Sequence, residues 1–149
     1  MRILPVVLAM SLGAGGAPAW AHEVLEYFAY GRAELSERGY DMAREVIRYA
    51  AAADDPHIII SGHIDTAEAE EFGDELGLGR AQAVPNELVK LGMDPARIEV
   101  VSRGDSMLAR PTPAGVREPL NRRVSVAIQF GRRPEAGFVP LAEGTAKEG

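Results

Sequence analysis

The stretch His57-Ile58-Ile59-Ile60-Ser61-Gly62-His63-Ile64-Asp65 predicts a buried strand that ends beside a carboxylate. A short, continuous apolar run is typical of a strand that is covered on both faces. Arg80 follows fifteen positions after this carboxylate, and Arg122 and Arg123 come later in the chain. A compact fold can bring the carboxylate and the guanidiniums together. Such a set is suited to a ligand that carries both an ammonium and a carboxylate group.

Strand and helix signals alternate before this stretch. His22 to Tyr30 has the character of a strand, and Gly31 stops it. A helix is expected next, with Ser36 as its N-cap and one apolar face made of Met42, Ala43, Val46, Ile47 and Ala50. Asp54-Asp55-Pro56 ends this helix, because the residue before proline avoids helical geometry. The order predicts a βαβ unit with a parallel pair of strands.

After the buried strand, residues 62–73 have the character of an acidic loop, and Asp74 to Leu91 that of a second helix. Gly77, Gly79 and Pro85 weaken this helix locally, so that a kink or a late start is expected. Gly92 is a natural C-terminal stop.

Two more strands complete the predicted fold. Arg97 to Ser102 is one, and a long loop at 104–119 separates it from Arg122 to Phe130. The last strand is the clearest, because apolar and polar side chains alternate along it. We therefore predict an α/β (α+β two-layer) fold of βαβαββ type, with helices packed on a small mixed sheet.

Length and composition fit one globular domain between two terminal segments. The chain has 149 residues, of which 46% are hydrophobic. Residues 1–21 predict a cleavable secretory signal with a positive Arg2, an apolar run and the small-x-small pattern Ala19-Trp20-Ala21. A membrane anchor or a buried N-terminal helix is the alternative. The domain is predicted at 22–130, and 131–149 is expected to be a mostly disordered tail.

The cysteine content and the net charge exclude some covalent modifications and some classes of partner. The chain has no cysteine, which excludes disulfides and a lipid-modified N-terminal Cys. We expect a soluble exported product with no membrane span in the mature chain. Loss of Arg2 with the signal leaves 15 of the 16 basic residues against 22 acidic ones, a formal charge of −7. Nonspecific binding of nucleic acid is not expected at this charge.

Six short motifs occur in a fixed order along the chain. They are Phe28-Ala29-Tyr30, Gly62-His63-Ile64-Asp65, residues 76–84 (LGLGRAQAV), residues 91–98 (LGMDPARI), Ser102-Arg103-Gly104-Asp105-Ser106 and Asn121-Arg122-Arg123-Val124. In this order and spacing the chain resembles the OmpA-like peptidoglycan-binding domain, which is also found in Pal lipoproteins and flagellar MotB stators. The resemblance covers about residues 23–130.

The resemblance implies noncovalent binding of peptidoglycan through the diaminopimelate of its peptide stem, as a periplasmic cell-envelope scaffold or tether. Asp65 would take the ammonium of the ligand, and Arg80 would clamp a carboxylate through its planar fork of donors. Arg122 matches a further ligand-contacting arginine, and Ile64 and Thr66 belong to the same binding loop. No covalent change is needed, so the resemblance implies no catalytic residue, no metal and no cofactor.

Four positions depart from the family's usual pattern. Ile64 stands where threonine is usual, Thr66 where Asn or Ser is common, and Gly73 and Gly77 replace Asn and Ser. The loop therefore has fewer neutral polar side chains to orient a ligand, while the charged residues Asp65, Arg80 and Arg122 are kept. The alternative is therefore a degenerate OmpA-like domain that acts as a protein-interaction module, with envelope proteins as its partners, and does not bind the cell wall.

Simpler roles are open for the same residues. Asp65 could cap the following turn, and Arg80 could form an ordinary surface ion pair. His57, His63 and Asp65 share strand parity, but a metal needs a fuller set of supported ligands. The acidic residues from Glu68 to Glu75 lack the spacing of a calcium loop and are expected to form a solvated loop.

Overall fold

The computed structural model describes residues 21–129, so the predicted tail and, apart from Ala21, the predicted signal segment lie outside the described residues. Four strands form one mixed sheet in the order β1-β4-β2-β3. The strands are β1 (Ala21–Tyr27), β2 (His57–His63), β3 (Ile98–Gly104) and β4 (Arg123–Gln129). The helices are α2 (Glu37–Ala51), α3 (Thr66–Glu71) and α4 (Glu75–Lys90), with 3-10 turns at Pro95–Arg97 and Pro119–Asn121. The predicted fold class, helices packed on a small mixed sheet, is confirmed.

The first two strands are parallel, but the prediction that they pair with each other is wrong. β1 and β2 run in the same direction, but β4 lies between them and is antiparallel to both. The parallel pair is β2 with β3. The central position suits β4, because Val124, Val126 and Ile128 are all fully buried there and the strand can hydrogen-bond on both edges.

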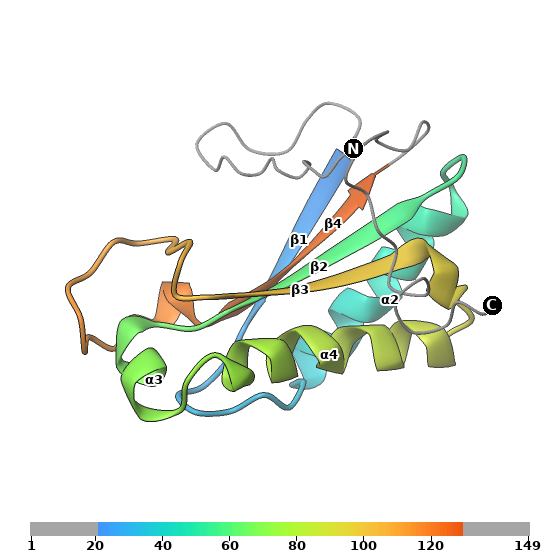
Figure 1. The fold of residues 1–149 in the computed structure, drawn as a ribbon. Coiled ribbons are helices and arrows are strands. Elements are labelled where there is room, and N and C mark those ends of the chain that lie inside the picture. Colours follow the sequence, from blue (N-terminus) through green and yellow to red (C-terminus); the bar gives the residue numbers. More distant parts are fainter. Residues whose placement is uncertain (1–20, 130–149) are drawn as a thin grey trace.

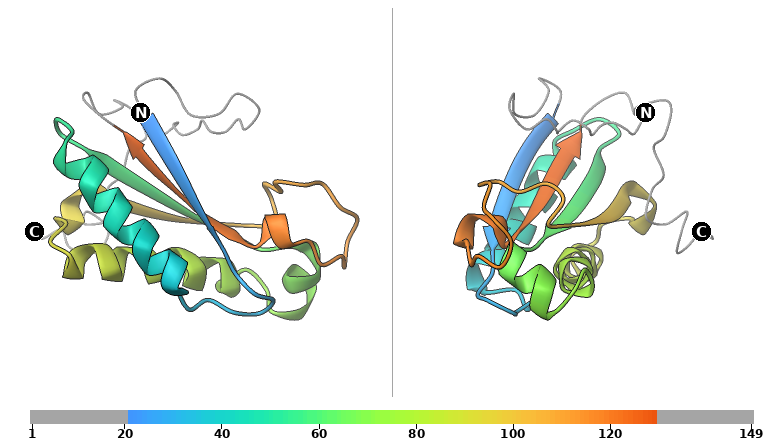
Figure 2. Two further views of the ribbon diagram at one scale, coloured as in Figure 1. Left: turned by 180° about the vertical axis from the view of Figure 1, so that it is seen from behind. Right: turned by 60° about the vertical axis from the view of Figure 1, so that its left-hand side comes forward.

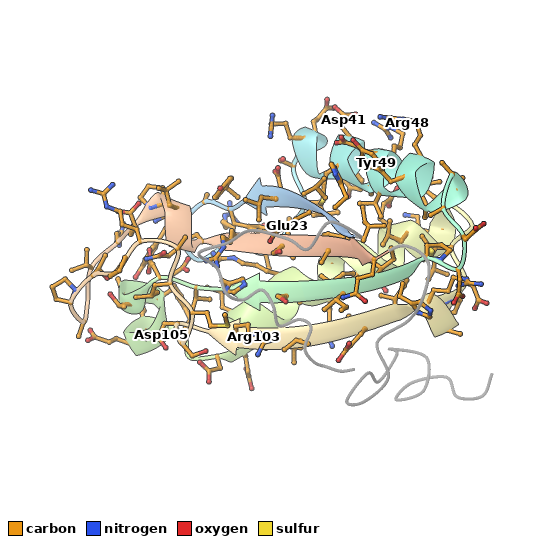
Figure 3. All side chains as sticks on the ribbon, turned by 90° about the horizontal axis from the view of Figure 1, so that it is seen from above. Glu23, Asp41, Arg48, Tyr49, Arg103 and Asp105 are labelled. Carbon is orange, nitrogen blue, oxygen red and sulfur yellow. The ribbon has the colours of Figure 1, made fainter. Side chains whose placement is uncertain are left out.

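Helices α2 and α4 cover one face of the sheet (Figures 1 and 2). The N-cap of α2 is Ser36, whose hydroxyl accepts from the amide of Gly39, as the sequence predicts. The expected apolar face of α2 packs into the core, which it shares with side chains of β2, β4 and α4. Figure 3 looks onto the sheet from above, with Glu23 of β1 and Arg103 of β3 labelled.

Helix α4 lies unusually close to β2. A Cβ atom on Gly62 would overlap the carbonyl oxygen of Gly77, so glycine is needed at position 62 for this approach. The helix begins at Glu75 and continues through Pro85, and the expected late start is therefore wrong. Close packing against the sheet stabilises a helix whose own sequence is unfavourable, and it fixes where Arg80 lies.

The predicted acidic loop at 62–73 is also wrong in part, because residues 66–71 form helix α3. Asp65 caps this helix, and Glu68 completes a capping box. Figure 1 shows α3 beside the end of β2, on the same side of the molecule as the long loop that follows β3. Over residues 21–129, no helix has the length and apolar character needed to cross a bilayer.

Candidate functional site

The three charged residues singled out in the sequence meet where β2 ends. Asp65 is fully buried. Its Oδ1 accepts from the amide of Glu68 at 2.7 Å, and its Oδ2 accepts from the amide of Glu118 and from Nη1 of Arg122, both at 3.0 Å. Asp65 therefore caps α3 and also ties it to the start of β4.

Arg80 is likewise fully buried, and all five of its N–H donors are engaged. Three donate to backbone carbonyls: Nε to Arg32 at 2.8 Å, Nη1 to His63 at 3.0 Å and Nη2 to Ala29 at 3.2 Å. The other two donate end-on to Glu68, Nη1 to Oε1 at 2.8 Å and Nη2 to Oε2 at 2.6 Å. The guanidinium thus joins the segment after β1 and the end of β2 to α3, and no N–H is left for a ligand.

Glu68 receives four hydrogen bonds and has no exposed surface. Besides the two from Arg80, its carboxylate accepts from the amides of Gly31 at 2.8 Å and Asp65 at 3.2 Å. The expectation that this residue belongs to a solvated acidic loop is wrong. The spacing Asp65-x-x-Glu68 is a capping-box signature, which was the available sequence signal.

Arg80, Glu68, Asp65 and Arg122 form a continuous row of two ion pairs, whose carboxylates are adjacent and are joined through the capping box. The row contains two guanidiniums and two carboxylates, so its formal charge is zero. Buried ions of this kind are tolerated only when paired and hydrogen-bonded, and removing one partner is strongly destabilising. Since the row links β1, α3, α4 and β4, it stabilises the geometry of the whole end of the sheet.

Arg122 is the outer member of this row, and its side chain is 13% exposed. Its Nε donates to the carbonyl of Phe28 at 3.0 Å. Within residues 21–129, no acceptor receives a hydrogen bond from its Nη2.

A second arginine lies near the same surface and was missed in the sequence. The guanidinium carbon of the exposed Arg117 lies 3.6 Å from the ring centre of Tyr30, and that of Arg122 lies 5.9 Å from it. The Tyr30 hydroxyl donates to Glu71 at 2.7 Å, and this bond raises the pKa of Tyr30. No local pattern marks Arg117, because its position depends on how the long loop folds back over the end of β2.

Ile64 and Thr66 are buried beside these charges. The amide of Ile64 donates to the carbonyl of Gly104 at 3.0 Å. The hydroxyl of Thr66 accepts from the amide of Val116 at 2.9 Å and donates to the carbonyl of Pro113 at 2.7 Å. These contacts hold the long loop against α3, and a contact of either residue with a ligand stays a prediction.

His63 lies on the other face of the sheet from Arg122. Burial, together with Arg123 and Arg103 nearby, lowers the pKa of His63 to about 3, so the imidazole is neutral. In the described part of the chain, no group of three or more His, Asp or Glu side chains is arranged to hold a metal ion.

The profile of the OmpA family matches residues 27–122, which contain every residue of the charged row. The chain belongs to the OmpA family. The OmpA-family resemblance drawn from the six motifs is thereby confirmed.

Two curated relatives from this family set the scale of the similarity. A peptidoglycan-associated lipoprotein of Pseudomonas putida is 32% identical over 103 residues, which cover 67% of this chain and 60% of that protein. An outer membrane protein of Gluconacetobacter diazotrophicus is 28% identical over 118 residues, 75% of this chain and 31% of that protein. The chain thus spans between about a third and three fifths of the length of these relatives.

Solved structures agree with the assignment to the OmpA family. The peptidoglycan-associated lipoprotein from Burkholderia pseudomallei has a TM-score of 0.57 and 25% identity, over 70% of this chain and 89% of that one. The cell wall anchor of the T6SS from Pseudomonas aeruginosa has a TM-score of 0.62 and 18% identity, over 74% and 82% of the two chains, and shows the shared fold alone. OmpA-family domains of this kind are structural binding domains and not enzymes.

Proposed function

We propose that this protein binds peptidoglycan noncovalently, through the diaminopimelate of the peptide stem, as a periplasmic scaffold or tether of the cell envelope. The observation that carries the proposal is the Asp65–Arg122 pair at 3.0 Å, whose arginine reaches the surface with a donor to spare. The relative from P. putida, which is named for its association with peptidoglycan, supports the same reading. An envelope protein partner and association with the outer membrane belong to this proposal.

The surface around Tyr30 suits a zwitterionic group, which carries a carboxylate and an ammonium. Arg122, with Nη2 unused among the described residues, offers a donor to a stem carboxylate, and the exposed Arg117 adds a second cation beside the same ring. Asp65 holds Arg122 in place from behind. The exposed carboxylate of Glu71, which accepts from the Tyr30 hydroxyl, suits the ammonium. Charges of both signs around one ring favour a ligand that carries both.

The resemblance assigns more direct roles to Asp65 and Arg80, contact with the ammonium and with the carboxylate. Those roles stay predictions. In the present arrangement both side chains are buried and their hydrogen-bonding capacity is spent on the protein. A ligand that used Arg80 would have to displace Glu68.

The full use of the Arg80 hydrogen-bond donors within the protein favours a second candidate function. A domain whose Arg80 serves its own carboxylate could have kept the OmpA-like fold while binding a protein instead of the cell wall. The two candidates differ in whether purified peptidoglycan alone is bound.

A sacculus pull-down separates them. We expect the purified protein to be retained by diaminopimelate-containing sacculi, and less by sacculi that carry lysine in place of diaminopimelate. Arg122→Ala and Arg117→Ala should each weaken retention about tenfold, since a hydrogen bond to a charged group contributes about 1.5–3 kcal/mol. Arg48→Ala is the control, because this exposed arginine lies on α2, away from α3 (Figure 3). Retention of the wild type no greater than that of an unrelated acidic protein would contradict the proposal.

A further inference from the structure

We propose that Glu68 is a tethered carboxylate that occupies an anion-binding cradle of this protein and thereby keeps external carboxylates out of it. Where it concerns the cell wall, this inference rests on the function proposed above. Where it concerns the cradle itself, it rests on the geometry around Glu68 alone.

The cradle consists of four N–H donors that converge on one carboxylate. Two come from the fork of Arg80, at 2.8 and 2.6 Å, and two are the backbone amides of Gly31 at 2.8 Å and Asp65 at 3.2 Å. A planar guanidinium fork supported by backbone amides binds carboxylates through charge-assisted, bidentate hydrogen bonds. Nothing in this donor set requires that the carboxylate belong to the protein.

The donors are held in place mainly without Glu68. Three backbone carbonyls, of Ala29, Arg32 and His63, orient the guanidinium of Arg80. The ring of Phe28 lies 5.1 Å from the guanidinium carbon. Gly31 has a φ of +72°, a conformation that side-chain-bearing residues rarely adopt and that fixes the direction of its amide. The cradle should therefore persist when the side chain of Glu68 is removed.

Glu68 competes well because it is tethered. It sits on α3, whose capping box it completes, so its carboxylate is delivered to Arg80 at a high effective concentration. An external carboxylate has to overcome this advantage, and it would also release one half of the capping box. Both effects lower the apparent affinity of the site for any ligand that needs Arg80.

Carboxylate rescue tests the inference. We expect Glu68→Ala to unfold at a lower temperature than the wild type, and sodium propionate to raise its unfolding midpoint more than sodium chloride does at the same concentration. Wild type should show no such excess. Glu70→Ala, which removes an exposed carboxylate from the same helix, is the matched control and should behave as wild type. Glu68→Gln keeps the shape of the side chain, fills the cradle and should show no propionate-specific gain.

The second measurement is calorimetric titration with a diaminopimelate-containing stem tripeptide, which Glu68→Ala should bind at least tenfold more tightly than wild type. Absence of a propionate-specific gain in Glu68→Ala, including a variant that stays unfolded in propionate, would overturn the inference. Propionate rescue without retention on sacculi by any form would leave the cradle established and refute the proposed function. Retention of wild type on sacculi without propionate rescue of Glu68→Ala would support the proposed function and refute the cradle.

Discussion

The carboxylate of Glu68 lies end-on against the guanidinium of Arg80, with oxygen–nitrogen distances of 2.8 and 2.6 Å between two fully buried side chains. The residues are twelve positions apart and belong to different helices. This pair changes the interpretation of Arg80 from a free ligand clamp to the inner anchor of a four-charge row, and leaves Arg122 as the member that reaches solvent.

Replacement of Arg80 should destabilise the fold. Arg80→Ala removes five hydrogen bonds and leaves Glu68 buried without a counter-charge, so we expect the free energy of unfolding to fall by about 3–5 kcal/mol. Arg80→Lys should recover only part of this, because an ammonium has three donors and no fork. Urea unfolding at neutral pH measures both. A loss below about 1 kcal/mol, as expected for the exposed Arg48→Ala, would show that the buried pair is not structural.

Glycine substitutions should have opposite effects at two positions near α4. Gly62→Ala puts a Cβ into the carbonyl of Gly77, and we expect it to cost about 1–3 kcal/mol or more. Gly79→Ala is expected to stabilise by about 0.5–1 kcal/mol, because the new methyl group would meet only the Cβ of Ala33 at 3.5 Å and the helix gains propensity. Thermal unfolding of the two variants checks this, and equal effects would contradict the close approach of β2 and α4.

Glu99 should make the protein less stable as the pH rises towards neutrality. Burial raises the pKa of Glu99 from 4.5 to about 7, so between these values the folded chain holds a proton that the unfolded chain has released. Stability from this group is therefore present below about pH 4.5 and is lost as the pH rises through 7. We expect Glu99→Gln to be more stable than wild type at pH 8 by about 1–2 kcal/mol, after allowance for partial exposure, and equal to it at pH 4.5.

His63 affects the pH dependence of stability in the opposite sense to Glu99. Its contribution therefore has to be separated from that of Glu99 in the experiment. Its pKa falls from 6.5 to about 3, so its contribution to stability is complete above about pH 6.5 and is lost as the pH falls towards 3. Because His63 is present in both proteins, the difference between wild type and Glu99→Gln isolates the glutamate. A difference that does not change between pH 4.5 and pH 8 would contradict the raised pKa.

Loss of the Thr66 hydroxyl should loosen the long loop. In Thr66→Val the amide of Val116 loses its acceptor at 2.9 Å, and we expect faster hydrogen exchange at that amide with a change in global stability of about 1–2 kcal/mol. Thr112→Val is the control, since the Thr112 hydroxyl lies at the exposed side of the same contact. Unchanged exchange at Val116 would show that the loop is held by other contacts.

Local signals were sufficient for much of the fold. The alternation along Arg123–Gln129 predicts which side chains enter the core, and Ser36 predicts the start of α2, because side-chain period and N-cap chemistry depend only on neighbours in the chain. The same holds for the capping box of α3, whose signature at Asp65 and Glu68 is present in the sequence although it was interpreted as part of a loop. The pairing of β4 between β1 and β2 has no such signal, since strand order depends on contacts between distant segments.

By itself, the sequence determined the α/β class, the family and the three charged residues that meet at the end of β2. Only the tertiary structure decided what those charges do. Whether an arginine faces solvent or a buried carboxylate depends on the packing of α3 and α4 against the sheet, and that packing assigned Glu68 to Arg80 and left Arg122 at the surface beside Arg117. The physical reason is burial: a charge removed from water must find its counter-charge within the protein, and the identity of that partner is a property of the fold.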